Sequence, residues 1–162
     1  MATNTSRLSP RQLAHPEVLW LTFFGVGFLR PAPGTWGSVA ALGVWWWGLS
    51  HLSMLMQAVL VMVYSVFSWW VCARYLQRSG LHDEPQIVAD EVAGLWLALL
   101  FVPVAWWSAL LTFGLFRTFD IVKPSLIGWV DRNTKGGLGV MADDLLAGLA
   151  AGALVAIVAL SV

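Results

Sequence analysis

Two pairs of acidic residues stand directly before apolar segments, and their side chains are the first candidates for chemistry. The pairs are Asp90 with Glu91 and Asp143 with Asp144. One such pair alone is typical of a helix start, where carboxylates interact with free backbone N–H groups and the helix dipole. Two pairs at neighbouring helix starts would repel one another unless a cation lay between them. Because hard oxygen ligands suit Mg²⁺, Mn²⁺ or Ca²⁺ rather than zinc, the pairs predict a shared divalent metal site.

A glycine follows each acidic pair by about one helical turn. Segments 89–95 and 142–149 resemble each other, and they carry Gly94 and Gly148 after their acidic pairs. Glycine lets two helices approach closely. We therefore expect these two segments to lie side by side and to bring the four carboxylates together.

Segment 116–124 combines two cations with a carboxylate. Arg117, Asp120 and Lys123 recur at every third position, so a helix would place them near one another. Two cations beside a carboxylate could bind a phosphate while Asp120 binds metal or accepts a proton. From the residues alone, a basic belt at the membrane surface with an internal salt bridge explains the pattern equally well.

Segment 25–38 is rich in glycine and proline and ends where an apolar run begins. A glycine-rich turn that leads into a helix presents backbone N–H groups to an anion. Gly34, Thr35 and Ser38 are therefore candidates for phosphate binding. The segment lacks the Gly-Lys-Ser/Thr of a Walker motif. A rigid turn at the membrane surface remains the alternative explanation.

The composition is that of an integral membrane protein. Hydrophobic residues make up 59% of the 162 residues and charged residues 11%, and the mean hydropathy is +0.74. Soluble domains are about 25% charged. Positive and negative residues balance at 9 each, so no overall positive field is available to bind nucleic acid. We expect a flexible tail over residues 1–16 and a single membrane domain over 17–162.

Three charge-free stretches predict an all-α fold, a small polytopic bundle of membrane helices. Stretch 31–73 is long enough for two spans with a polar break at 50–53, and stretch 145–162 can form one span. Stretch 92–116 could form either one tilted span or two half-length helices. All nine Lys and Arg lie outside these stretches, and positive residues favour the cytoplasmic side. A re-entrant hairpin that turns around Pro103 would keep every charged cluster on that side.

Four motifs, in this order, resemble the phosphatidylglycerophosphatase A family. They are Arg-Pro-Ala-Pro-Gly-Thr-Trp-Gly-Ser (30–38), Ile-Val-Ala-Asp-Glu-Val-Ala-Gly (87–94), Phe-Arg-Thr-Phe-Asp-Ile-Val-Lys-Pro (116–124) and Asp-Arg-Asn-Thr-Lys-Gly-Gly-Leu-Gly-Val-Met-Ala-Asp-Asp (131–144). The resemblance covers residues from about 24 to 150. It implies an all-helical, Mg²⁺-dependent lipid phosphatase of the bacterial inner membrane, which converts phosphatidylglycerophosphate into phosphatidylglycerol and phosphate. One departure is Ser125, where the family often has a second proline, and it should affect loop stiffness more than chemistry.

Residues and resemblance together predict a phosphoryl-transfer site that faces the cytoplasm. The expected Mg²⁺ ligands are Asp90, Glu91, Asp143 and Asp144. The expected phosphate-binding residues are Gly34, Thr35, Ser38, Arg117 and Lys123. The expected catalytic set is Asp120, Asp143, Asp144, Arg117 and Lys123. A water activated at the metal is the expected nucleophile, and an aspartyl-phosphate formed on Asp120 or Asp143 is the alternative.

Other functions stay open at this point. A phosphatase of another phosphorylated lipid would use the same residues. A non-catalytic membrane subunit or a small transporter is a different class, although the apolar stretches contain no charged residue of the kind that transporters place there. The number of metal ions, the oligomeric state and the selectivity among lipids are not determined by these patterns.

Overall fold

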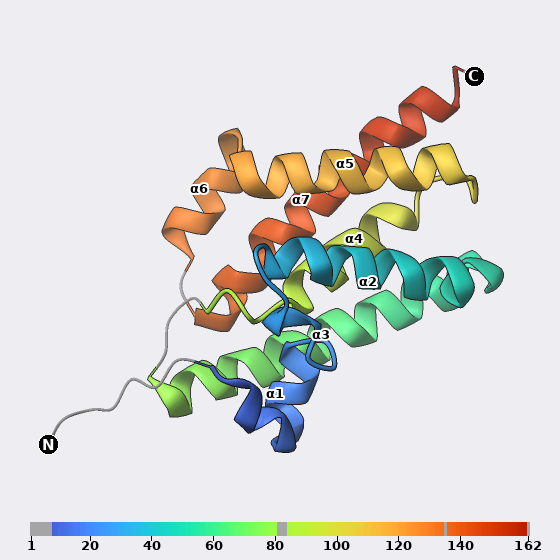
Figure 1. Cartoon of the computed structure of the whole chain (residues 1–162). Helices are drawn as coiled ribbons and strands as arrows, with labels where there is room; N and C mark the ends of the chain where they lie inside the picture. The colour runs from blue at the N-terminus through green and yellow to red at the C-terminus, as the bar shows by residue number, and fades with distance from the viewer. Residues whose placement is uncertain (1–7, 81–83, 135, 162) are drawn as a thin grey trace, which may run out of the picture.

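The computed structural model describes residues 8–80, 84–134 and 136–161, and every regular element in these ranges is a helix (Figure 1). The α-helices are α1 (Pro16–Leu21), α2 (Pro33–Trp47), α3 (Met54–Ser79), α4 (Ala89–Leu99), α5 (Trp106–Val122), α6 (Ser125–Asn133) and α7 (Gly136–Ala159). Short 3-10 helices occupy Pro10–Ala14, Val26–Phe28 and Leu49–His51. Helix α4 lies at the centre and contacts α2, α3, α5 and α7. The prediction of an all-α fold is confirmed.

Two of the described helices are long and apolar enough to cross a membrane. They are α3, with 26 residues, and α7, with 24 residues. The polar break expected at 50–53 is confirmed, because α2 ends at Trp47 and Ser53 caps the start of α3. Stretch 31–73 was expected to contain two full spans, but only α3 is long enough. Helix α2 has only 15 residues and is about 22 Å long.

Helices α4 and α5 form the hairpin that the charge distribution predicted. The turn occupies residues 100–105, and Ser108 Oγ donates hydrogen bonds to the carbonyl oxygens of Pro103 and Ala105. The hairpin in Figure 1 returns the end of α5 toward the start of α4. There, Arg117 Nη1 lies 3.7 Å from Glu91 Oε1. With 11 residues, α4 is about half as long as a membrane span.

Helices α4 and α7 cross with their backbones in contact. A β-carbon added to Gly148 would lie 2.1 Å from the carbonyl oxygen of Gly94, and one added to Gly152 would lie 2.6 Å from that of Ala98. These positions accept only glycine without a shift of the backbone. The expectation that the two acidic segments lie side by side is confirmed.

Helix α7 starts earlier than the sequence suggested. It begins at Gly136, so Asp143 and Asp144 lie about two turns inside the helix rather than at its start. Glycine has a low helix propensity, but here it permits close packing. A β-carbon on Gly137 would lie 2.6 Å from the backbone nitrogen of Ala73 in α3. Tertiary packing therefore extends the helix through a glycine-rich segment.

The second half of the segment 1–16, which we expected to be a flexible tail, contains a short 3-10 helix. Residues 1–7 lie outside the described residues. From Leu8 onward the chain is folded: the side chain of Leu8 is buried, and the Ser9 backbone nitrogen donates to Gln12 Oε1 at 2.9 Å. This hydrogen bond caps the 3-10 helix Pro10–Ala14. Burial of an apolar side chain fixes a segment whose other residues are mostly polar.

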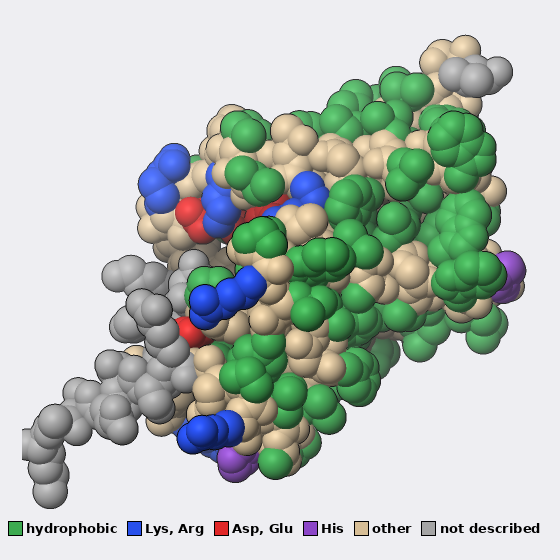
Figure 2. Space-filling model, viewed as in Figure 1, with side chains coloured by type: hydrophobic (Ala, Val, Ile, Leu, Met, Phe, Trp, Pro, Cys, Tyr) green, Lys and Arg blue, Asp and Glu red, His purple; other side chains and the backbone are tan. Residues whose placement is uncertain are grey.

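The molecular surface separates apolar from charged side chains. In Figure 2, hydrophobic side chains cover most of the right-hand part of the molecule, where the α2–α3 and α4–α5 turns lie, whereas Lys, Arg, Asp and Glu gather on the left. Large apolar side chains on that part are exposed, among them Trp47 at 82% and Trp106 at 70%. Such extensive exposure is unusual in soluble monomers. Together with the two long apolar helices, it is consistent with a small all-α membrane protein.

Candidate active site

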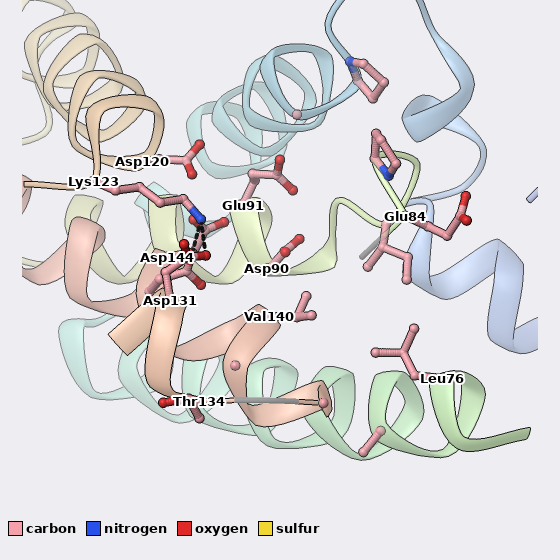
Figure 3. Close-up of a pocket in the computed structure, with 18 of the residues that line it drawn as sticks. Leu76, Glu84, Asp90, Glu91, Asp120, Lys123, Asp131, Thr134, Val140 and Asp144 are labelled. Atoms are coloured by element: carbon pink, nitrogen blue, oxygen red, sulfur yellow. Dashed lines mark hydrogen bonds and ion pairs between the residues drawn. The ribbon is translucent and has the colours of Figure 1, made fainter. Parts of the chain in front are cut away.

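A cavity of about 880 Å³ opens among the charged ends of the helices (Figure 3). Residues from α2, α3, α4, α5, α6 and α7 line it. Its charged lining residues are Glu84, Asp90, Glu91, Arg117, Asp120, Lys123, Asp131, Asp143 and Asp144. The cavity therefore gathers charged side chains that are up to 60 positions apart in the chain.

Three carboxylates from two helices form a compact cluster in this cavity. One oxygen each from Asp90, Glu91 and Asp144 lies within 4.8 Å of the others. Asp144 is only 3% exposed. Asp90 Oδ1 and Glu91 Oε2 are buried and have no hydrogen-bond partner among the described residues. Buried acceptor oxygens without donors are costly. The donor set and its unpaired oxygens fit a divalent cation with oxygen ligands.

Close helix packing builds this cluster. Asp90 and Glu91 occupy the first turn of α4. Asp144 reaches them because a β-carbon on Gly94 would lie 2.5 Å from the Asp144 carbonyl oxygen, so the two backbones touch at this point. Burial raises the pKa of Glu91 to about 8, and the neighbouring Asp144 carboxylate adds to the shift. Burial, with Glu91 nearby, also raises the pKa of Asp90. Without a cation, the cluster favours protonated carboxyls.

Arg117 connects this cluster to α2 and α5. Its Nη1 atom donates a hydrogen bond to Asp120 Oδ2 and lies 3.7 Å from Glu91 Oε1. Its Nε atom is buried and has no acceptor among the described residues. Gly34 leaves room for this arrangement, because a β-carbon there would lie 2.0 Å from Glu91 Oε1 and 3.1 Å from Arg117 Nη2. The start of α2 therefore borders the charged residues directly.

Lys123 bridges two carboxylates at the other side of the cavity. Its Nζ atom donates to Asp143 Oδ2 at 2.6 Å and to Asp131 Oδ1 at 2.5 Å (Figure 3). Partial burial alone would lower the pKa of Lys123, but the hydrogen bonds to both carboxylates raise it above its ordinary value. Asp143 is thus paired with Lys123 and lies outside the three-carboxylate cluster.

Sequence reasoning missed Asp131 as a residue of the site. Asp131 follows Lys123 by eight positions, which on a continuous helix would place them about 12 Å apart along the axis, too far for an ion pair. The chain bends between α5 and α6, where Lys123 and Ser125 have φ values of 48° and 47°. The Lys-Pro dipeptide at 123–124 was the available signal, because the residue before a proline disfavours helix continuation.

Two expected phosphate-binding residues do not line the cavity. Ser38 is fully buried, and its hydroxyl donates to the carbonyl oxygen of Gly34 at 2.8 Å. Thr35 also lies outside the lining, whereas Gly34 belongs to it. The reason is local: a serine inside a helix satisfies its hydroxyl on the carbonyl four residues earlier. The Ser38 hydroxyl is therefore bonded within α2 and does not face the cavity.

Comparison with known proteins identifies the family. The family described as Phosphatidylglycerophosphatase A matches residues 19–159 of this chain. The chain belongs to the phosphatidylglycerophosphatase A family. The resemblance inferred from the four motifs is thereby confirmed, and the expectation of an enzyme is confirmed with it: the protein is a phosphatase. A non-catalytic membrane subunit or transporter is no longer required to explain the sequence.

Curated relatives cover most of the chain. A protein of Escherichia coli (strain K12) named Phosphatidylglycerophosphatase A is 34% identical over 139 residues, which are 85% of this chain and 80% of that protein. A Haemophilus influenzae protein of the same name is 36% identical over 150 residues, 91% of each chain. A Bacteroides thetaiotaomicron protein named Putative phosphatidylinositol-3-phosphatase is 38% identical over 146 residues, 86% of this chain and 91% of that protein. No solved structure gives a significant match.

Proposed function

We propose that this phosphatidylglycerophosphatase A family member hydrolyses phosphatidylglycerophosphate to phosphatidylglycerol and phosphate, with Mg²⁺ as cofactor. The observation that carries the proposal is the convergence of three carboxylates and two cations in one cavity at the charged end of apolar helices. The names of the Escherichia coli and Haemophilus influenzae relatives support this substrate. A two-chain phospholipid fits an enzyme whose site lies at the end of membrane helices.

Asp90, Glu91 and Asp144 are the residues that would hold Mg²⁺. These three carboxylates are clustered, and two of them have a buried oxygen without a hydrogen-bond donor, which supports this assignment. When bound, Mg²⁺ supplies positive charge that stabilises the phosphoryl group in the transition state. Asp143 was expected as a fourth ligand. Its hydrogen bond to Lys123 supports a different role, which is to position the lysine ammonium group.

Arg117 and Lys123 bind the terminal phosphate in this mechanism. The unpaired N–H of Arg117 Nε is available to a phosphate oxygen, and the guanidinium plane is oriented by Asp120. Phosphoryl transfer depends mainly on charge neutralisation and alignment. Asp120 also borders Asp144. We assign Asp120 the task of orienting the attacking water and receiving its proton.

The position of the charged residues supports a site on the cytoplasmic side of the bacterial inner membrane. The ends of α3 and α5 and the starts of α2, α4 and α7 lie together at the charged end of the bundle (Figure 1). None of the nine Lys and Arg lies between positions 31 and 73, so the turn that joins α2 to α3 carries none. Positive residues favour the cytoplasmic face.

The decisive experiment measures inorganic phosphate released from phosphatidylglycerophosphate by the detergent-purified full chain. We expect release with Mg²⁺, none with EDTA, and recovery when Mg²⁺ is added back in excess. The Asp144→Asn variant should be inactive, whereas Glu17→Gln, an acid outside the cavity, should retain activity. Metal-independent release would overturn the Mg²⁺ assignment.

A second substrate is suggested by the name of the Bacteroides thetaiotaomicron relative. Phosphatidylinositol-3-phosphate is also a phosphomonoester on a two-chain lipid, so the same cavity could accept its phosphate. Measuring kcat/KM for both lipids under identical conditions decides between them. We expect the larger kcat/KM for phosphatidylglycerophosphate. A larger kcat/KM for phosphatidylinositol-3-phosphate would make that lipid the proposed substrate instead.

A further inference from the structure

A second cavity lies between α1 and α3, apart from the candidate active site. It has a volume of about 420 Å³ and shares no lining residue with the larger cavity. Its aromatic and charged lining residues are Glu17, Trp20, Phe67, Trp70, Arg74 and Arg78. On α3, Ala73 and Leu76 line the active-site cavity instead, so the two cavities use different faces of this helix. We call the second cavity the α1–α3 groove.

One part of the α1–α3 groove is aromatic and apolar. The rings of Trp20 and Phe67 meet edge to face, with their centroids 4.9 Å apart. Trp20 Nε1 donates to Ser68 Oγ at 2.9 Å, so the polar atom of the indole is already satisfied. Phe67 and Trp70 are 44% and 45% exposed. These rings present an apolar surface that suits a hydrocarbon chain.

The other part of the groove is positively charged. The Arg74 guanidinium carbon lies 4.3 Å from the centroid of the Trp70 ring, a cation–π contact that holds the guanidinium beside this ring. No carboxylate in the described part of the chain forms an ion pair with Arg74. Arg78 Nη1 lies 3.5 Å from Glu17 Oε2. Two arginines and one glutamate leave one net positive charge, which complements a ligand with one negative charge.

The depth of the groove in the membrane indicates what occupies it. The part of α3 before Arg74, residues 54–73, carries no charged side chain. At about 1.5 Å per residue it is about 30 Å long, which equals the hydrocarbon thickness of a bilayer. Arg74 therefore lies at the level of the lipid phosphates. Trp70 and Phe67 lie one and two turns deeper, at the level of the acyl chains.

We propose that the α1–α3 groove is a binding site for one anionic phospholipid of the surrounding bilayer. The phosphodiester contacts Arg74 and Arg78, and one acyl chain lies against Trp20, Phe67 and Trp70. The lipid is a bound structural ligand on a separate face of α3 and is not hydrolysed there. The proposal depends on the membrane location of α3 and not on the substrate of the enzyme.

The test measures lipid binding to the detergent-purified full chain by native mass spectrometry. The probe is phosphatidylmethanol, an anionic phosphodiester lipid that is neither substrate nor product of the proposed reaction. Phosphatidylcholine, which has no net charge, is the comparison lipid. Because charge-assisted hydrogen bonds to phosphate are lost, the double variant Arg74→Gln/Arg78→Gln should bind phosphatidylmethanol about tenfold more weakly or worse.

Matched variants distinguish binding in the α1–α3 groove from general electrostatic attraction between the protein and anionic lipids. Arg11→Gln/Arg30→Gln removes the same charge outside the groove and should bind as the unaltered protein does. Trp70→Leu should weaken binding, whereas Trp69→Leu, a neighbouring exposed tryptophan outside the groove, should not. Equal losses in both double variants, or equal binding of the two lipids, would overturn the proposal. The readout requires no turnover, so a failure of the proposed phosphatase activity would not affect it.

Discussion

Gly94 of α4 and Gly148 of α7 touch through their backbones, since a β-carbon added to Gly148 would lie 2.1 Å from the Gly94 carbonyl oxygen. Each glycine lies one helical turn after a carboxylate of the cluster, Asp90 in α4 and Asp144 in α7. The crossing point therefore sets the distance between these carboxylates. A change of a few tenths of an ångström at the glycines would be transmitted to the candidate metal site.

The first prediction concerns this crossing. Gly148→Ala should destabilise the protein by about 1–3 kcal/mol or more, because backbone atoms cannot move aside easily. Activity should fall as well, since the carboxylates are displaced. Thermal unfolding in detergent and phosphate release measure the two effects. Gly114→Ala is the matched control, because a β-carbon there meets no other atom within 4 Å. If Gly148→Ala left both the unfolding temperature and the activity unchanged, α4 and α7 would not cross as described.

The second prediction separates the roles of two adjacent aspartates. Asp144→Asn should weaken Mn²⁺ binding, measured by electron paramagnetic resonance with Mn²⁺ in place of Mg²⁺. Asp143→Asn should leave Mn²⁺ binding nearly intact but lower turnover, because Lys123 loses its buried partner.

A double-mutant cycle checks the assignment of Asp143. If Asp143 acts through Lys123, Asp143→Asn and Lys123→Gln together should reduce turnover little more than either change alone. Fully additive losses, or a large loss of Mn²⁺ binding in Asp143→Asn, would return Asp143 to the set of metal ligands.

The third prediction is a pH dependence of the metal-free protein. Glu91 has a pKa of about 8 in the fold, above its ordinary value of 4.5. Between these pH values the folded state keeps a proton that the unfolded state releases, so the free energy of unfolding decreases as the pH rises. With EDTA present, the unfolding midpoint should therefore fall from about pH 5 to about pH 8.

Two comparisons assign this pH dependence to Glu91. Glu91→Gln removes one titrating carboxyl and should make the fall of the midpoint with pH less steep. Asp90, whose pKa burial also raises, should account for the slope that remains. Mg²⁺ competes with the proton, so its addition should raise the midpoint more at the alkaline end than at the acidic end. A midpoint that rises with pH in EDTA would contradict the burial of Glu91.

The fourth prediction tests the start of α2. In Gly34→Ala the new methyl group would meet Glu91 Oε1 at 2.0 Å. The end of a side chain can move away, so the stability cost should be small, but Glu91 then leaves its place in the cluster. Phosphate release should fall at least about tenfold with an unfolding midpoint near that of the unaltered protein. Gly43→Ala, in the same helix with open space around it, should change neither property.

Local sequence patterns predicted the features that depend on charge placement and residue size. The polar break before α3 and the hairpin at Pro103 follow from where charged and polar residues can lie in a membrane. The contact of Gly94 with Gly148 follows from the need for small residues where helices cross. The hairpin between α4 and α5 is the feature that brings Arg117 close to Glu91.

The remaining features depend on tertiary packing that a single segment does not reveal. Gly137 is helical because α3 lies against it, in spite of its low propensity. Asp131 enters the cavity only because the backbone bends at Lys123. The Ser38 hydroxyl donates to the backbone carbonyl of Gly34, although a serine hydroxyl could also bind an anion. In each case a neighbour or a dihedral angle decides the role of the residue.

The crossing of α4 and α7 also determines when the enzyme becomes complete during its synthesis. Asp90 and Glu91 leave the ribosome more than 50 residues before Asp144. Until α7 is made, α4 is an 11-residue helix whose glycine face has no partner. Helix α7 therefore supplies both Asp144 and the glycine-rich surface against which α4 packs. A nascent chain that stops before α7 lacks Asp144, one of the three carboxylates of the candidate site, so we expect unfinished chains to be unable to hydrolyse lipid phosphates.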